Sequence, residues 1–204
     1  MTAKKYHHGD LHNALIQAGL DILAQEGVHG LSLRKVASQA GVSHGAPYAH
    51  FADKQALIAA IATEGYRRLY DRLYQVSQAF SGDPLLQLIE GAWGYVEFAL
   101  DDSAHFRVTF SGIVEKEKDY PALVEATDKC FDLVLQFVKA CQAAKILDAG
   151  VPDLMTVSIW GAVHGLISLI MDGQISHTVL ERFTVRQMLF HTLRQFCRVE
   201  LPAN

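Results

Sequence analysis

Apolar residues recur every three or four positions along almost the whole chain, and this helical period is the feature that most limits the fold. In the first segment, Leu11, Leu15, Ala18 and Ile22 fall on one helical face. Further helices are expected over about 53–79, 84–100, 121–146, 152–172 and 184–199. Residues 106–113 fit a strand or a short helix, and we expect a helix because no strand partner is in reach. The pattern predicts an all-α fold.

Capping residues separate these helices. Gly27 follows the first helix, as a residue in the left-handed region does at many helix ends. Ser32 is placed to cap a short helix that Gly41 ends, and Ser43 to cap another reaching about residue 51. Asp83 and the proline after it are a start signal for a later helix.

The chain divides into a head and a body of different charge. We expect a DNA-binding head over residues 1–60 and a ligand-binding and dimerisation body over 61–204. Residues 1–68 hold seven lysines and arginines against five acidic residues, whereas the remainder is acidic and the whole chain carries a net charge of −4. A mildly basic head is a weak indication of a polyanionic partner.

Composition and motifs exclude several classes. Half of the residues are apolar and 20% are charged, which is an ordinary globular balance. The three cysteines form no C-x-x-C pair, so neither a disulfide framework nor a cysteine zinc site is indicated. No hydrolase, P-loop or dinucleotide motif occurs, so we expect no enzyme and no cofactor. The polar start lacks a secretory signal, which favours the cytoplasm.

The stretch from Leu154 to Met171 contains no Asp, Glu, Lys or Arg. It reaches the lower length limit for a membrane span, but Thr156, Ser158 and His164 dilute its apolar character. We expect a bundle helix and no membrane contact. A helix that is apolar on all sides needs neighbours on all sides, in a deep core or shared between a core and a dimer interface.

Two short helices joined by a glycine turn have the geometry that places the second one in a DNA major groove. Ala37 is small enough for the helices to cross closely, and Gly41 supplies the turn. The N-terminal amides of the second helix suit a phosphate. This pattern predicts a three-helix helix-turn-helix head on a helical bundle.

The head resembles that of the tetracycline-repressor (TetR) family of bacterial transcription regulators. The residues that carry the resemblance are Gly27, Ser32, Val36, Ala37, Ala40, Gly41, Val42, Ser43, Tyr48, Phe51, Lys54 and Leu57. The opening from Tyr6 to Leu11 looks like a subgroup named for a Trp-His-Gly signature, which Trp160, His164 and Gly165 match. The resemblance implies a homodimer that binds a palindromic operator and represses transcription until a small apolar or aromatic effector binds its body.

Chemistry and the resemblance together assign the expected DNA contacts. They are Ser32, Arg34, Ser43, His44, Gly45, Ala46, Tyr48, His50 and Lys54. Lys54 and Tyr48 are expected to hold phosphates, and His44 to reach a base edge. The alternatives are that the two serines only cap helices, that Tyr48 packs in the head and that His50 is an ordinary surface residue. Pro47 falls at the fourth position of the expected second helix and removes one of its hydrogen bonds.

For the effector, the expected residues are Trp93, Phe106, Phe110, Phe131, Trp160 and His164. Trp160 and His164 share a helical face because they are four residues apart. The alternative is an ordinary core with a neutral histidine. The second candidate function is a metal-responsive regulator using His8 and His12, or a thiol-responsive one using Cys130 and Cys141.

Overall fold

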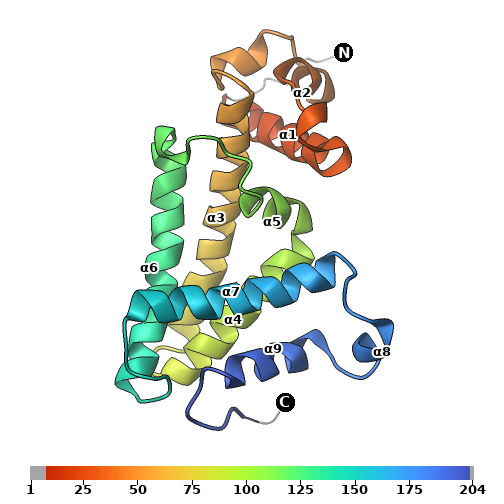
Figure 1. The fold of residues 1–204 in the computed structure, drawn as a ribbon. Coiled ribbons are helices and arrows are strands. Elements are labelled where there is room, and N and C mark those ends of the chain that lie inside the picture. The colour runs from red at the N-terminus through yellow and green to blue at the C-terminus, as the bar shows by residue number, and fades with distance from the viewer. Residues whose placement is uncertain (1–7, 203–204) are drawn as a thin grey trace. The chain divides into compact units, whose positions relative to one another are not determined.

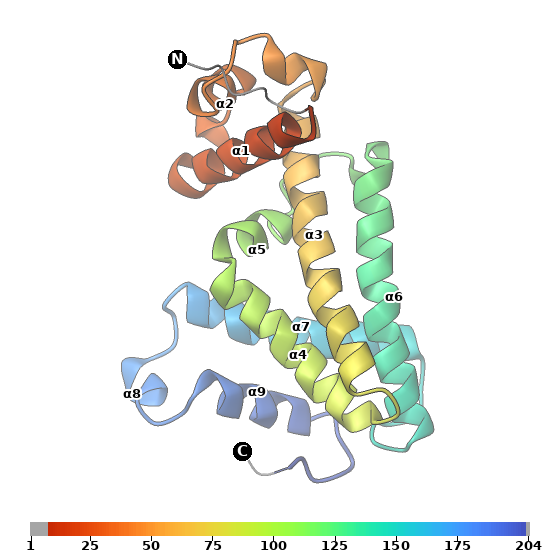
Figure 2. The ribbon, with the colours of Figure 1, turned by 180° about the vertical axis from the view of Figure 1, so that it is seen from behind.

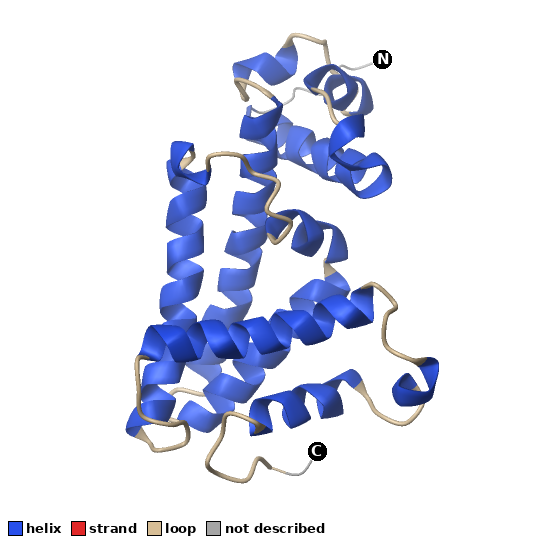
Figure 3. Ribbon diagram, viewed as in Figure 1, coloured by secondary structure: helices blue, strands red, loops and turns tan. Residues whose placement is uncertain are grey.

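The computed structural model describes residues 8–202, and their regular elements are helices, as the sequence predicts (Figures 1 and 3). The α-helices are α1 (His8–Gly30), α2 (Leu33–Gln39), α3 (Lys54–Ala79), α4 (Pro84–Asp101), α5 (Ser103–Thr109), α6 (Pro121–Ala143), α7 (Pro152–Met171), α8 (His177–Leu180) and α9 (Val185–Arg194). Two 3₁₀ helices are η1 (Ala46–Ala49) and η2 (Glu117–Asp119). An isolated antiparallel bridge joins Leu147 to Cys197.

Three helices begin where the capping residues predict, but Ser43 does not cap η1, whose N-cap is Gly45 without a side-chain hydrogen bond. The Ser32 hydroxyl accepts the Lys35 amide at 3.2 Å, and an Asp83 carboxylate oxygen accepts the Leu86 amide at 3.0 Å. Thr184 and Gln187, three residues further on, form a reciprocal capping box at the start of α9. Gly27 interrupts α1 with a φ of 69°. These local signals fixed the helix starts because each satisfies an amide that the helix itself leaves unpaired.

Two compact units are formed, each from two stretches of the chain. Of the described residues, the first comprises 8–67 and 102–127, and the second 68–101 and 128–202. Helices α3 and α6 contribute residues to both. The expected boundary at residue 60 separates a DNA-binding head from a ligand-binding body. It concerns function, and it stays a prediction.

In the first unit, α1 packs against α2 and α5. Its core contains Leu15, Val36, Leu57 and Ile61, which are fully buried. Burying each such side chain contributes about 1.5–3 kcal/mol. The choice of a short helix over a strand for residues 106–113 is confirmed by α5, although α5 begins earlier and ends at Thr109. Helix α3 approaches α5 so closely that a β-carbon on Gly65 would lie 1.9 Å from Thr109 Oγ1.

The second unit is built around α4, α7 and α9, which pack on one another (Figures 1 and 2). Helix α7 buries a stripe of four residues on one side: Thr156, Ile159, Val163 and Ile167. By length and composition α7 is apolar enough to cross a membrane, with a mean hydropathy of 1.8, and 22% of that apolar window is buried. The rest of its surface carries exposed apolar side chains, Leu154, Val157, Trp160 and Leu169.

Several expected boundaries are wrong, and α6 ends at Ala143 rather than near residue 146. The helix expected from Ser43 to about residue 51 is the shorter η1, in which Pro47 occupies the first turn, where its missing N–H costs no hydrogen bond. The last helix ends at Arg194 rather than near residue 199. Beyond it the chain turns back, and the Arg198 amide donates to the Ile146 carbonyl at 2.8 Å. Helix α8 has no counterpart among the expected elements.

Candidate functional site

The turn between α2 and η1 is set by Gly41. Its φ of 69° is one that glycine adopts at little cost. The Val42 amide donates back to the Ala37 carbonyl at 3.0 Å, which closes the turn. After it, the Ala46 amide donates to the Ser43 carbonyl at 2.9 Å and starts η1. The segment from residue 43 to residue 48 is therefore held by backbone bonds, and its side chains remain available.

The predicted DNA contacts lie mostly on the surface of the first unit. Six are exposed: Ser32, Arg34, Ser43, His44, Gly45 and Tyr48. Three are half-buried: Ala46, His50 and Lys54. Between them, Pro47 and Phe51 are buried and anchor η1 to the core. Tyr48 is 57% exposed, so its ring is presented to solvent rather than packed in the head.

Two of these residues also make contacts within the head. Lys54 Nζ lies 3.4 Å from the Val28 carbonyl oxygen, which ties the start of α3 to the end of α1. The His50 ring packs near Phe51 and edge-on to His12, with centroids 6.3 and 5.7 Å apart respectively. These contacts place both side chains at the edge of the exposed segment.

The predicted contact residues that the first unit presents at its surface carry groups that can contact DNA. The hydroxyls of Ser32, Ser43 and Tyr48 and the ammonium of Lys54 can donate hydrogen bonds to phosphates, and Arg34 adds a positive charge. His44 is the exposed imidazole next to Gly45, where an added β-carbon would meet no atom within 4 Å. Such an open backbone can approach a groove closely, which leaves His44 free to contact a base edge.

The structure gives the metal and thiol alternatives little support. Among the described residues, no group of three or more His, Cys, Asp or Glu side chains gathers as a metal site requires. The His8 side chain lies outside the described residues. Burial raises the pKa of Cys130 and of Cys141 to about 12, which disfavours the reactive thiolate.

The predicted effector residues separate into different groups. Phe106 and Phe110 lie in the first unit, where Phe110 also packs edge-on to Tyr66, with 5.5 Å between centroids. The other four belong to the second unit: Trp93, Phe131, Trp160 and His164. The predicted set is therefore not one cluster within either unit.

Trp160 and His164 both contact the hydroxyl of Tyr95, a residue that sequence reasoning missed. The Tyr95 hydroxyl lies 2.6 Å from His164 Nδ1 and accepts the Trp160 indole N–H at 3.3 Å. Burial lowers the pKa of His164, which favours the neutral imidazole. Tyr95 lies on α4, far from α7 in the sequence, so helical spacing gave no signal for it.

The second unit also has an open groove of about 560 Å³ between α3, α4 and α6. Its lining includes the buried side chains of Leu133 and Phe137 and the stacked rings of Tyr70 and Tyr74. Its size is ordinary for a small-molecule site. None of the six predicted effector residues lines it.

Sequence reasoning also missed two buried polar side chains on α5, those of His105 and Thr109. His105 is 1% exposed; its Nδ1 lies 2.8 Å from Asp102 Oδ1, and its Nε2 is buried with no hydrogen-bond partner among the described residues. Thr109 Oγ1, one turn further on, is in the same state. Unpaired buried polar atoms are destabilising, so this face of α5 is a weak point in the core of the first unit.

Comparison with known proteins agrees with this architecture. The family described as "Bacterial regulatory proteins, tetR family" matches residues 15–61, and "Tetracyclin repressor-like, C-terminal domain" matches residues 88–193. The HTH-type transcriptional regulator AcrR of Shigella flexneri is 29% identical over 166 residues, which cover 78% of this chain and 75% of that protein. The class A tetracycline repressor protein from transposon 1721 of Escherichia coli is 48% identical over 50 residues, 24% of this chain and 23% of its own.

Solved structures share the fold as well. A protein of unknown function from Rhodococcus sp. RHA1 aligns with a TM-score of 0.77 and 28% identity, over 96% of this chain and 100% of that one. The carboxyl-terminal family match alone spans more than half of the chain, and the helix-turn-helix match covers the segment that presents the exposed residues described above. This protein belongs to the TetR family of DNA-binding transcriptional regulators, which are not enzymes.

Proposed function

We propose that the protein is a cytoplasmic repressor that binds a palindromic operator as a homodimer and is released when a small apolar or aromatic effector binds its body. The observation that carries the DNA-binding part is the exposed segment from Ser43 to Tyr48, which η1 anchors through buried Pro47. We assign His44 to a base edge, and Tyr48 and Lys54 to phosphates. Base contacts give the sequence preference, and phosphate contacts give the salt dependence.

The support for a homodimer is the outer face of α7. Leu154 is 67% exposed and Val157 is 50% exposed, although the helix carries no charge between residues 154 and 171. An added β-carbon on Gly161 or Gly165 would meet nothing of the same chain within 4 Å. These glycines therefore need no close neighbour in their own chain, but they would let a second helix approach. With α9 beside it, α7 supplies half of a four-helix interface.

We place effector binding in the second unit. It holds the linked Tyr95, Trp160 and His164 side chains and the groove beside Tyr70 and Tyr74. We also assign the body to the subgroup with the Trp-His-Gly signature, because Trp160 and His164 occupy that motif. An effector weakens DNA binding only as far as its affinities for the bound and free forms differ.

Selection of bound duplexes from a random pool, followed by footprinting, tests the proposed operator. A dimer predicts a two-fold symmetric site with half-sites about one helical turn, ~34 Å, apart. Enrichment of a single, unsymmetric site would contradict the homodimer but leave DNA binding intact. Absence of any enriched sequence would contradict operator recognition itself.

A further inference from the structure

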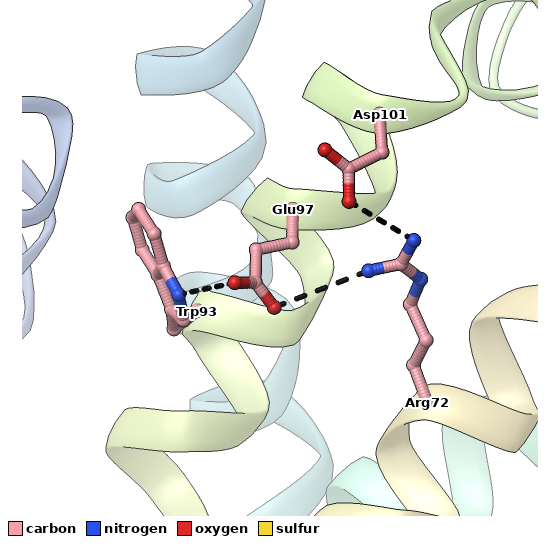
Figure 4. Close-up of polar contacts among 4 residues, drawn as sticks. All are labelled: Arg72, Trp93, Glu97 and Asp101. Atoms are coloured by element: carbon pink, nitrogen blue, oxygen red, sulfur yellow. Dashed lines mark hydrogen bonds and ion pairs between the residues drawn. The ribbon is translucent and has the colours of Figure 1, made fainter.

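One face of α4 carries a row of carboxylates around a tryptophan. Glu90, Trp93, Glu97 and Asp101 follow one another at steps of three, four and four, so they share this face. Two arginines contact this face. Arg72 of α3 lies at one end (Figure 4), and Arg186 of α9 lies at the other. Three carboxylates therefore face two cations.

A hydrogen bond at one edge of the ring fixes the indole of Trp93. Its N–H donates to Glu97 Oε1 at 2.8 Å (Figure 4). Arg72 holds that carboxylate in turn, with Nη1 3.9 Å from Glu97 Oε2 and Nη2 3.1 Å from Asp101 Oδ2. Because these bonds fix the edge of the ring, the ring keeps one orientation and offers its face to a neighbour.

That neighbour is a cation of the protein itself. The Arg186 guanidinium carbon lies 5.0 Å from the centre of the Trp93 ring and 5.6 Å from that of Phe190. The same guanidinium is paired with Glu90 at 2.5 Å. Aromatic faces are electron-rich, and a carboxylate adds a full negative charge, so this is the arrangement that binds organic cations. We call Glu90, Trp93 and Phe190 the cation cage.

In the single chain the cage is reachable from solvent. The Arg186 side chain is 34% exposed and that of Glu90 is 21% exposed. Arginine carries its charge on a long flexible stem, so the guanidinium can leave the cage without unfolding of α9. Arg182, in contrast, lies over the single ring of Phe183, at 5.2 Å, on the exposed segment before α9.

We propose that the cation cage is a binding site for organic cations, that Arg186 occupies it in the free protein, and that a ligand with a guanidinium or quaternary ammonium group competes with Arg186 for it. Such a ligand would gain two aromatic faces and one carboxylate. Identifying this ligand as the effector rests on the proposed function, and it adds a positive group to the aromatic effector described there. Displacement would also free α9 from one of its attachments to α4.

Titration with methylguanidinium, followed by the indole N–H resonances of the protein without DNA, tests the proposal. The chain has two tryptophans, so a Trp160→Phe variant assigns the Trp93 signal. Arg186→Gln keeps most of the stem and removes the competing charge. Because a tethered group competes at a high effective concentration, this variant is expected to bind methylguanidinium at least about tenfold more tightly than the wild type. Adding Glu90→Gln should abolish the gain.

Two controls separate a cation site from a mere helix clamp. Methylurea has nearly the shape of methylguanidinium without its charge and should not move the Trp93 signal. Arg182→Gln should leave the affinity at the wild-type value. Equal affinities of Arg186→Gln and wild type, or equal effects of methylurea, would overturn the proposal.

A measurement on the wild type avoids dependence on the folding of any variant. Saturating methylguanidinium should shift the Nε–H signal of Arg186 together with that of Trp93, while Arg182 stays in place. An unmoved Arg186 signal would refute the competition. Because no DNA is present, failure of operator binding leaves this test unaffected.

Discussion

Replacing Gly161 and Gly165 of α7 by alanine separates the stability of the single chain from that of the proposed dimer. Within one chain, the added methyl groups of Gly161→Ala and Gly165→Ala meet no atom within 4 Å. Alanine is favoured over glycine inside a helix by about 0.5–1 kcal/mol per site, so the pair should stabilise the folded chain by ~1–2 kcal/mol. In a dimer that uses this face, the same methyl groups intrude between helices.

Overpacking of this kind costs about 1–3 kcal/mol, which weakens association by ~5- to 150-fold. Sedimentation equilibrium measures the dissociation constant, and urea unfolding at protein concentrations below that constant measures the stability of the single chain. Gly150→Ala is the matched control, because its added methyl group is also unobstructed but lies outside α7. An unchanged dissociation constant together with a stabilised chain would refute α7 as the dimer face.

Further predictions concern the head, the α3–α5 contact and His164. Lys54→Ala should weaken binding to all duplexes alike and reduce the slope of log affinity against log salt by about one; an unchanged slope would remove Lys54 from the phosphate contacts. His44→Ala should change sequence preference by ~1–3 kcal/mol, and equal losses on operator and random DNA would argue against a base contact. Gly65→Ala should destabilise the fold in urea by ~1–3 kcal/mol, because its methyl group would lie 1.9 Å from Thr109 Oγ1, and no loss would mean that α5 shifts freely. Burial lowers the pKa of His164 below 6.5, so its contribution to stability should be present above pH 6.5 and lost as the pH falls through its folded pKa; His164→Gln should remove that part of the pH dependence of unfolding.

The sequence predicted the elements that rest on local interactions. Ser32, Asp83 and Thr184 cap helices because each side chain satisfies an amide within three residues of itself. The helix-turn-helix turn was predictable for the same reason, since Gly41 and its flanking bonds span only a few residues.

The predictions that failed concern features set by competing local structures or by residues distant in the sequence. Pro47 favours a 3₁₀ turn over a continued α-helix, and the carboxyl-terminal chain leaves α9 early to pair with residues 146 and 147. In the body, the sequence identified bulky aromatic residues but not their neighbours. Tyr95 and Arg186 come from elements remote in the sequence, and only the packing of α4, α7 and α9 brings them to Trp160 and Trp93.

The central claim is that the head recognises an operator through the segment from Ser43 to Tyr48. Protection of DNA by the head tests this claim most directly. Footprinting of the wild type and of a variant with His44→Ala and Tyr48→Ala on the same selected duplex should give a two-fold symmetric protected site for the first protein and none for the second. Both side chains are exposed, so the variant should keep its fold, which its unchanged circular dichroism would verify. Equal protection by the two proteins would contradict recognition through the segment from Ser43 to Tyr48.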